Sequence, residues 1–235
     1  MPEPTRLPSG YNNIPEGNRQ HPLRMLPAPD PTRLVEYFND FLSYDTDDWT
    51  LTQSGGTVAL ADGDGGLATL TASTGGTDYC YLQVPKLQFY PEVGKQLWFE
   101  ARLKLDAVST GKAVVGLVAQ DATPIANTDG IYFAKDTAGT GAIDFVVKKT
   151  STATTAAAIK TAVADTFVRL GFYYDGKSTI SYYVDGVKAG DVAATNLPSA
   201  GLTVTIALLA TSAAERVLTV DYVYAAKERR VFAAY

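Results

Sequence analysis

Histidine and cysteine are almost absent from this sequence. The 235 residues include one of each. A lone cysteine, Cys80, cannot form a disulfide within the chain, which excludes a disulfide-stapled scaffold, and its neighbours Tyr79 and Tyr81 predict a buried, inert thiol in a strand. The lone histidine, His21, lies in a proline-rich region, and any Ser-His-Asp, Cys-His or multi-histidine zinc site would depend on it. We therefore expect none of these chemistries.

The sequence also lacks an excess of positive charge and long hydrophobic runs. Lys and Arg total 20 against 25 for Asp and Glu, which gives a net charge of -5. Nucleic-acid binding depends on clustered positive charge that displaces counterions, so we expect no nucleic-acid partner. No basic segment followed by an apolar core opens the sequence, and no long uncharged apolar run follows later. We therefore expect a soluble protein without a membrane partner.

Proline is concentrated at one end of the chain. Residues 1–31 contain eight of the 12 prolines, which prevent a continuous helix or a central strand, so we expect an extended arm over residues 1–33. Two interpretations stay open: a disordered tail, or an arm that orders along a neighbouring subunit. In the second, the binding residues are the sparse apolar side chains of the arm: Leu7, Tyr11, Ile14, Leu23, Met25 and Leu26.

Residues 167–190 carry the clearest structural pattern. Apolar residues alternate along 168–174 and again along 180–184, and the turn segments 175–178 and 185–186 follow these runs. Both turn segments contain Asp-Gly, in which glycine takes positive φ and the aspartate side chain bonds nearby backbone. The pattern predicts a β-hairpin followed by a second tight turn.

Short strands with glycine-rich turns are expected through most of the remaining chain. Residues 32–49 fit either an edge strand or one face of a short helix, and we favour the strand. Residues 150–164 mix Ala, which favours a helix, with β-branched Thr, and they predict a loop or a weak strand. The expected strands are 49–54, 57–60, 67–72, 79–84, 97–105, 113–120, 131–134, 143–149, 202–210 and 217–224. Together they predict an all-β sandwich of antiparallel sheets over residues 34–226, with a short tail at 227–235.

Three aspartates follow the first expected strand. Asp45, Asp47 and Asp48 form either a solvated turn that their side chains cap or a loop that binds calcium, since hard cations take clustered carboxylate oxygens. Calcium is therefore the one cofactor that the sequence leaves open.

The run FVRLGFYYDGKSTISYYVDGVKAG, followed by an apolar strand and a terminal LTVDYVYA, resembles the carboxy-terminal half of concanavalin A-like (laminin-G-like) jelly rolls. The earlier segment DFLSYDTDDWTL is similar to the way such domains open in bacteriophage virion proteins. The resemblance covers residues 37–226 and implies a jelly roll of two antiparallel sheets. This superfamily includes glycosidases, lectins and virion surface domains, so the fold alone does not select a function.

The acidic residues predict no enzyme. A retaining glucanase of this fold would carry two glutamates and an aspartate alternating along one strand, and no two of the seven glutamates share a strand at that spacing. The first functional hypothesis is a non-enzymatic decoration (cement) protein of a tailed bacteriophage. In this hypothesis the chain is a homo-oligomer, a dimer or trimer, whose arm binds the major capsid protein on the outer capsid surface.

The alternative hypothesis is a carbohydrate-binding, lectin-like module, for example on a phage fibre. Sugars stack on aromatic rings through their apolar faces, and Tyr173 and Tyr183 lie on the side of the 167–190 hairpin opposite the expected core. The same tyrosines also fit ordinary cross-strand pairs or a subunit interface.

Overall fold

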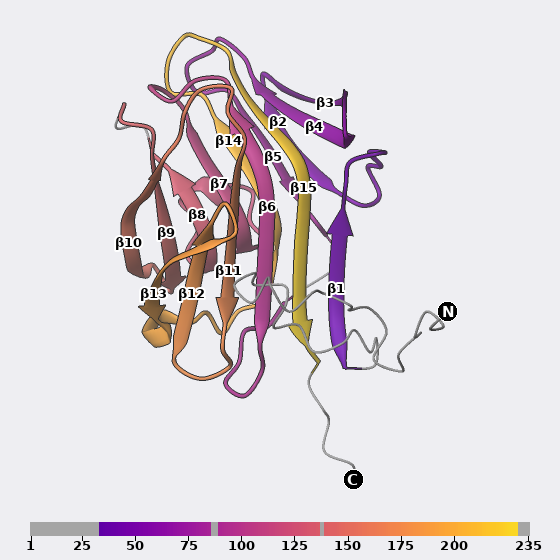
Figure 1. The fold of residues 1–235 in the computed structure, drawn as a ribbon. Helices are drawn as coiled ribbons and strands as arrows, with labels where there is room; N and C mark the ends of the chain where they lie inside the picture. The colour runs from indigo at the N-terminus through magenta and orange to yellow at the C-terminus, as the bar shows by residue number, and fades with distance from the viewer. Residues whose placement is uncertain (1–32, 86–88, 137–138, 230–235) are drawn as a thin grey trace, which may run out of the picture.

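The structure is a computed structural model that describes residues 33–85, 89–136 and 139–229 (Figure 1). Two antiparallel sheets face each other, so the predicted all-β sandwich is confirmed. The arm at 1–32 and the end of the tail at 230–235 lie outside the described residues. None of the described residues forms a helix long and apolar enough to cross a membrane.

Eight strands form the first sheet, called sheet A here. In spatial order its main path is β13 (Val187–Ala193), β12 (Thr179–Val184), β11 (Val168–Tyr174), β6 (Leu97–Leu105), β15 (Arg216–Glu228), β4 (Gly65–Ala72) and β3 (Gly56–Gly63). The eighth strand, β1 (Leu34–Asn39), pairs with the second half of β15. The edge strand expected within residues 32–49 is therefore confirmed.

Seven strands form the second sheet, sheet B. Their spatial order is β10 (Thr152–Thr161), β9 (Ala142–Lys149), β8 (Gly130–Lys135), β7 (Lys112–Ala119), β14 (Leu202–Leu209), β5 (Tyr79–Gln83) and β2 (Thr50–Ser54). Two short 3-10 turns, η2 (Pro124–Ala126) and η3 (Ala194–Asn196), pack beside strands of this sheet. The Ala- and Thr-rich segment that predicted a loop or a weak strand forms the edge strand β10.

The hairpin predicted at residues 167–190 is β11–β12, whose register pairs Leu170 with Val184 and Tyr174 with Ile180. The side chain of Asp175 closes the connecting turn by accepting from two backbone N–H groups, those of residues 177 and 179. Asp185 and Gly186 both have positive φ in the next turn, as a tight two-residue hairpin connection requires. Both turns thus have the chemistry that the sequence predicts.

Apolar side chains from both sheets fill the space between them. Four phenylalanines form the centre, with ring centroids 5.1 to 6.3 Å apart among Phe133, Phe145 and Phe172 and 5.4 Å between Phe99 and Phe172. Each such buried ring stabilises the fold by roughly 1.5 to 3 kcal/mol. Cys80 is fully buried in β5, which confirms the predicted burial in a strand, and burial raises the pKa of its thiol to about 12.

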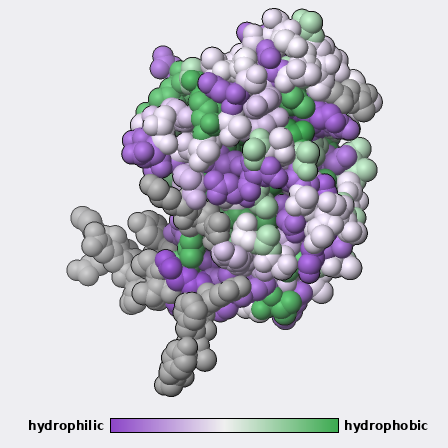
Figure 2. Space-filling model, turned by 180° about the vertical axis from the view of Figure 1, so that it is seen from behind, coloured by the Kyte–Doolittle hydropathy of each residue, from purple (hydrophilic) through white to green (hydrophobic). Residues whose placement is uncertain are grey.

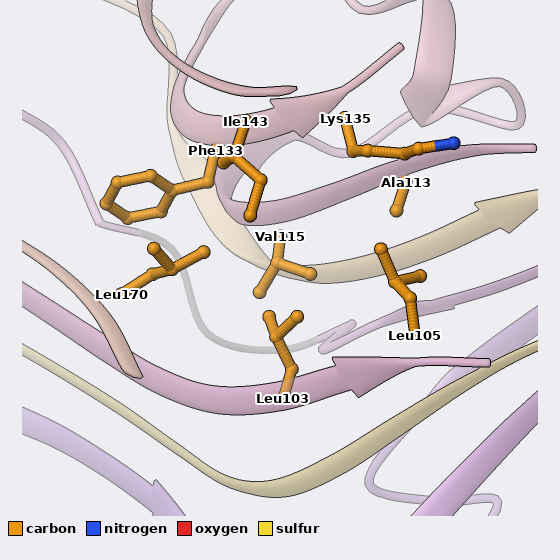
Figure 3. Close-up of a pocket in the computed structure, with 8 residues that line it drawn as sticks. All are labelled: Leu103, Leu105, Ala113, Val115, Phe133, Lys135, Ile143 and Leu170. Carbon is orange, nitrogen blue, oxygen red and sulfur yellow. The ribbon is translucent and has the colours of Figure 1, made fainter. Parts of the chain in front are cut away.

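A small cavity remains near one end of this core (Figure 3). Its volume is about 20 Å³, enough for one or two waters, whereas small-molecule sites need hundreds of Å³. The amine of Lys135 points away from it and donates to the carbonyl oxygens of Thr110 and Gly111 at 3.0 and 2.7 Å. The lining residues are Leu103, Leu105, Ala113, Val115, Phe133, Lys135, Ile143 and Leu170. This cavity is therefore too small for a ligand, and we look for candidate sites on the outer faces of the described sheets.

Candidate functional site

The predicted sugar-stacking residues lie on the outer face of sheet A. Tyr173 and Tyr183 are 5% and 6% exposed and belong to a cluster with Trp98, which is 1% exposed. The rings of Trp98 and Tyr173 are 5.5 Å apart. The full set, called the sheet A cluster below, is Leu34, Trp98, Tyr173, Tyr183 and Ala226. The two tyrosines thus sit opposite the core, within a closely packed group, and their sugar contact stays a prediction.

The other predicted site residues are placed only in part. The arm residues Leu7, Tyr11, Ile14, Leu23, Met25 and Leu26 lie outside the described residues. Asp45, Asp47 and Asp48 form a turn in which the Asp45 carboxylate accepts from the Asp47 N–H at 2.8 Å. Among the described residues, no three His, Cys, Asp or Glu side chains gather closely enough to hold a metal ion. The calcium loop therefore stays a prediction without a ligand set around it.

A second apolar cluster covers the outer face of sheet B, and the sequence analysis missed it. Along β7, Val115 and Leu117 point into the core while Val114 and Val118 point outward. The outward cluster, called the sheet B platform below, consists of Tyr81, Val114, Val118, Tyr132, Val146 and Ala207, with Tyr79, Ile125, Ala134 and Leu209 packed against it. In strands such as β7, apolar residues occupy successive positions instead of alternating with polar ones. That pattern was the signal in the sequence for a second apolar face.

The register builds a strip of small side chains across this platform. Tyr81 lies opposite Ala207, Ala207 opposite Val114, and Val114 opposite Ala134. Tyr132, also on β8, lies opposite Gly116 of β7, and a Cβ at Gly116 would come within 2.5 Å of the Tyr132 Cα. The strip from β5 to β8 crosses three inter-strand spacings, or roughly 14 Å. The result is a low apolar floor with tyrosines at both sides.

Two of the platform tyrosines form a stacked pair. The rings of Tyr79 and Tyr81 are 4.6 Å apart and 15° from parallel, and Tyr79 is only half-buried. Burial raises the pKa of Tyr81 to about 12 and also raises that of Tyr132. The phenols of Tyr81 and Tyr132 are therefore neutral at physiological pH, and no member of the platform is an Asp, Glu, Lys, Arg or His residue.

Polar groups border the floor. The amide of Gln83 donates to Thr205 Oγ1 at 3.0 Å, and its Oε1 accepts from the Asp121 N–H at 3.1 Å. Gln83 is 4% exposed, so its side chain is held in one orientation beside Tyr81. Both amide atoms of Gln83 are therefore bonded within the protein, and they fix this end of β5 against β14.

Carboxylates are scarce on this sheet. Its seven strands contain one acidic residue, Asp144 on β9, whose Oδ1 accepts from the Ala158 N–H at 2.7 Å. Hydrolysis of a glycosidic bond by the usual route needs two carboxyl groups on either side of the bond. These strands alone therefore do not supply such a pair.

Figure 2 shows the molecule from the side opposite to Figure 1. Hydrophobic residues lie there in separate groups among hydrophilic ones. A broad continuous apolar patch, typical of an obligate protein interface, is not seen among the described residues in this view.

Comparison with known proteins identifies the fold. No family model and no curated protein matches the sequence. An endo-1,3-beta-glucanase from Streptomyces sioyaensis is similar in structure, with a TM-score of 0.61 and 18% identity over 86% of this chain and 99% of that chain. An endo-beta-1,4-glucuronan lyase from Trichoderma reesei has a TM-score of 0.57 and 10% identity over 80% of this chain and 94% of that chain.

A third similar structure is the carbohydrate recognition domain of Emp46p, with a TM-score of 0.56 and 11% identity over 80% of this chain and 93% of that chain. Together these likenesses confirm the predicted concanavalin A-like jelly roll. At such low identities they show the fold alone.

The comparisons also correct one prediction. We expected a protein that is not an enzyme, because the acidic residues lack the spacing of a glucanase. That exclusion is wrong, since several proteins of this same fold are glucanases and one is a lyase. The missing acid spacing argues only against the mechanism of a retaining glucanase. A lyase cleaves its substrate by a different mechanism, so the spacing says nothing about lyase activity. None of these names mentions a bacteriophage, so the virion assignment gains no support from them.

Proposed function

We propose that this protein recognises a polysaccharide on the sheet B platform. The observation that carries the proposal is the stacked pair Tyr79–Tyr81, in which Tyr79 is half-buried and supplies the accessible ring. The neighbouring Ala207 and Val114 are 0% and 4% exposed and support this pair from within the sheet. The likeness in fold to an endo-1,3-beta-glucanase and to a carbohydrate recognition domain supports it.

The chemistry of the platform favours a neutral glycan. A sugar ring has one face of C–H groups that can lie on an aromatic or small aliphatic surface, while its hydroxyls point sideways to hydrogen-bonding groups. The half-buried ring of Tyr79 offers an accessible stacking surface, and Gln83 lies beyond Tyr81 at the other end of β5. An uncharged β-glucan matches these features better than a uronic-acid polymer.

Titration calorimetry with soluble laminarin and mixed-linkage β-glucan tests this proposal, and a parallel assay for new reducing ends or unsaturated products detects cleavage of the same polymers. We expect Tyr79→Ala to weaken binding about tenfold, or about 1.4 kcal/mol. Tyr79→Phe is the matched control, since it keeps the ring and should bind like the unaltered protein. Absence of binding to either glucan, or full affinity in Tyr79→Ala, would refute the proposal.

Capsid decoration is our second proposal, favoured by a different observation. Phe38, at the end of the edge strand β1, is 60% exposed, and Leu42 beyond it is 75% exposed. Exposed apolar side chains beside a sheet edge are a common feature of protein docking surfaces. The proposed partner is the major capsid protein, on the outer capsid surface, with a dimer or trimer of this chain and with the arm as the binding segment.

Cosedimentation with phage capsids tests this second proposal. A chain lacking residues 1–31 should stay folded and lose saturable binding, while Phe38→Ser should weaken it. Full occupancy of the capsids by the truncated chain would show that the arm does not carry the attachment.

A further inference from the structure

The chain contains the dipeptide Asp-Gly five times, and this dipeptide can modify itself. The pairs are residues 62–63, 64–65, 129–130, 175–176 and 185–186. The backbone nitrogen of the glycine can attack the side-chain carboxyl carbon of the aspartate, because glycine has no Cβ to hinder the approach and has a freely adjusted backbone. The attack requires an aspartate side chain that is free to turn towards its own main chain. The surroundings of each aspartate therefore decide which pair reacts.

Two of the five aspartates are held by backbone groups of neighbouring turns. Asp129 Oδ1 accepts from the Thr150 N–H at 3.1 Å. Asp175 Oδ1 accepts from the N–H groups of residues 177 and 179 at 2.7 and 3.1 Å. Turning either carboxylate towards the following glycine would break these hydrogen bonds, which costs free energy. Both pairs are therefore protected in the folded chain.

The next two aspartates are restrained in other ways. Asp185 Oδ1 accepts from the Arg169 N–H at 3.0 Å, and its Oδ2 lies 3.2 Å from the Lys160 amine. Asp62 belongs to the strand β3, where its register partner is Gly66 of β4. The ion pair and hydrogen bond fix the first side chain, and strand pairing fixes the main chain of the second.

Asp64 differs from the other four. It lies in the loop that joins β3 to β4 and belongs to neither strand, and both Asp64 and Gly65 are exposed. Within the part of the chain that the structure describes, no hydrogen bond or ion pair holds the Asp64 carboxylate. This carboxylate is therefore the one most free to turn towards the nitrogen of the following glycine.

The loop also requires the glycine that makes the attack easy. Gly65 has a φ of +96°, which strains any residue with a Cβ, and three-residue hairpin loops commonly need such a residue. A Cβ at this position would also lie 3.0 Å from Asp40 Oδ2. The fold thus keeps at position 65 the residue that leaves the Asp64 side chain unprotected.

We propose that Asp64 is a site of spontaneous isomerisation to isoaspartate. The Gly65 nitrogen forms a bond to Asp64 Cγ, and the proton of the nitrogen leaves with the hydroxyl of the protonated carboxyl group as water, which closes a succinimide ring. Water then adds to one ring carbonyl and breaks its C–N bond. Addition at the side-chain carbonyl restores aspartate, whereas addition at the backbone carbonyl gives isoaspartate. The chain gains and loses one water, and no oxidant or reductant takes part.

The modified bond lies beside a buried corner of the sandwich. The Gly66 N–H donates to the Asp40 carbonyl oxygen at 3.0 Å, and the Phe41 carbonyl leaves no room for a Cβ at Gly66. Isoaspartate routes the main chain through the former side chain and so adds one atom to the loop just before this contact. The ring of Phe41 is stacked on Trp49 in the core, so the lengthened loop acts on core packing. This inference depends on neither proposed function.

Peptide mapping of the aged full-length chain tests the proposal. The chain is kept at physiological pH and temperature for several weeks and digested, and electron-transfer fragmentation, which distinguishes isoaspartate from aspartate, quantifies each pair. We expect isoaspartate to form several-fold faster at Asp64 than at Asp129, Asp175 or Asp185. A matched sample kept unfolded in guanidinium is the control, because the same five dipeptides should then react at similar rates.

The variant Asp64→Ser removes the reacting carboxyl group. It should show no modification at this position, while the other four pairs keep the rates of the unaltered chain. Equal rates at Asp64 and at the three bonded aspartates of the folded chain would overturn the proposal, because the fold would then not select the site. A position 64 that reacts in guanidinium but stays unmodified in the folded chain would also overturn it, since the loop would then be protective.

Discussion

The two outer faces of the sandwich use aromatic residues in different settings. On sheet A, aromatic rings lie among charged groups: Tyr222 donates to Glu100 Oε1 at 2.7 Å, and Arg102 pairs with Asp221 while its guanidinium lies over the ring of Phe167. On sheet B, tyrosines lie among Ala, Val and Thr, with one acidic residue in seven strands. The comparison shows that one sandwich can carry aromatic side chains in a charged setting on one outer face and in a nearly uncharged setting on the other.

The largest expected difference between the faces is in stability. Trp98→Ala should lower the free energy of unfolding by about 3 to 5 kcal/mol, because it removes a large, almost fully buried ring. Tyr79→Ala, at a half-buried position, should cost less than about 1 kcal/mol. Urea unfolding monitored by circular dichroism measures both. Equal losses in the two variants would mean that the faces do not differ in how closely they are packed.

Alkaline pH should affect both faces alike. Burial raises the pKa of Tyr173 on sheet A and of Tyr81 on sheet B to about 12, against about 10 in an unfolded chain. Between these values the folded protein keeps protons that the unfolded chain loses, so stability is fully present below pH 10 and falls as the pH rises towards 12. Each tyrosine contributes up to about 2 to 3 kcal/mol to this loss.

Tyr81→Phe and Tyr173→Phe isolate the two contributions. Each variant should flatten the decline in stability between pH 10 and 11.5, measured by urea unfolding at several pH values. If only Tyr173→Phe flattens the decline, the pKa of Tyr81 is not raised by burial and its phenol is open to solvent.

Much of the sheet A side could be predicted from the sequence, because the β11–β12 hairpin is encoded locally. Alternating apolar residues set its two faces, and Asp175, Asp185 and Gly186 set its turns. The pairing of β15 with β6, β4 and β1 could not be predicted in this way, since these contacts join residues more than a hundred positions apart. The strand β10 was ambiguous because its Ala and Thr residues have opposing propensities, and pairing with β9 decides the outcome.

The sheet B platform could not be predicted as a site for a related reason. Val114 and Tyr132 belong to the consecutive strands β7 and β8, whereas Ala207 belongs to the distant strand β14, and only the register brings the three into one cluster. A strand that is apolar on both faces is also expected where protein covers both sides of a sheet. The pattern alone therefore does not tell whether the outer face is covered by protein or open to a ligand.

The smallest expected effect concerns the ion pairs found on sheet A. Lys188 Nζ and Asp191 Oδ1 are 2.8 Å apart, and both side chains are about half exposed. The hydrogen bond from Lys188, with that from Ser181, lowers the pKa of Asp191, so its contribution to stability is present at neutral pH and is lost as the pH falls through that lowered pKa.

Asp191→Asn should therefore cost only about 0.2 to 1 kcal/mol at low ionic strength, because water screens an exposed pair and the asparagine oxygen still accepts from Ser181. In 1 M NaCl the difference from the unaltered chain should shrink further, since the Debye length falls to about 3 Å. Glucan binding at the uncharged sheet B platform should not change over the same range of salt. The opposite result would be glucan binding that depends strongly on salt, together with a stability cost of Asp191→Asn that does not. That result would mean that charge matters more on sheet B than on sheet A.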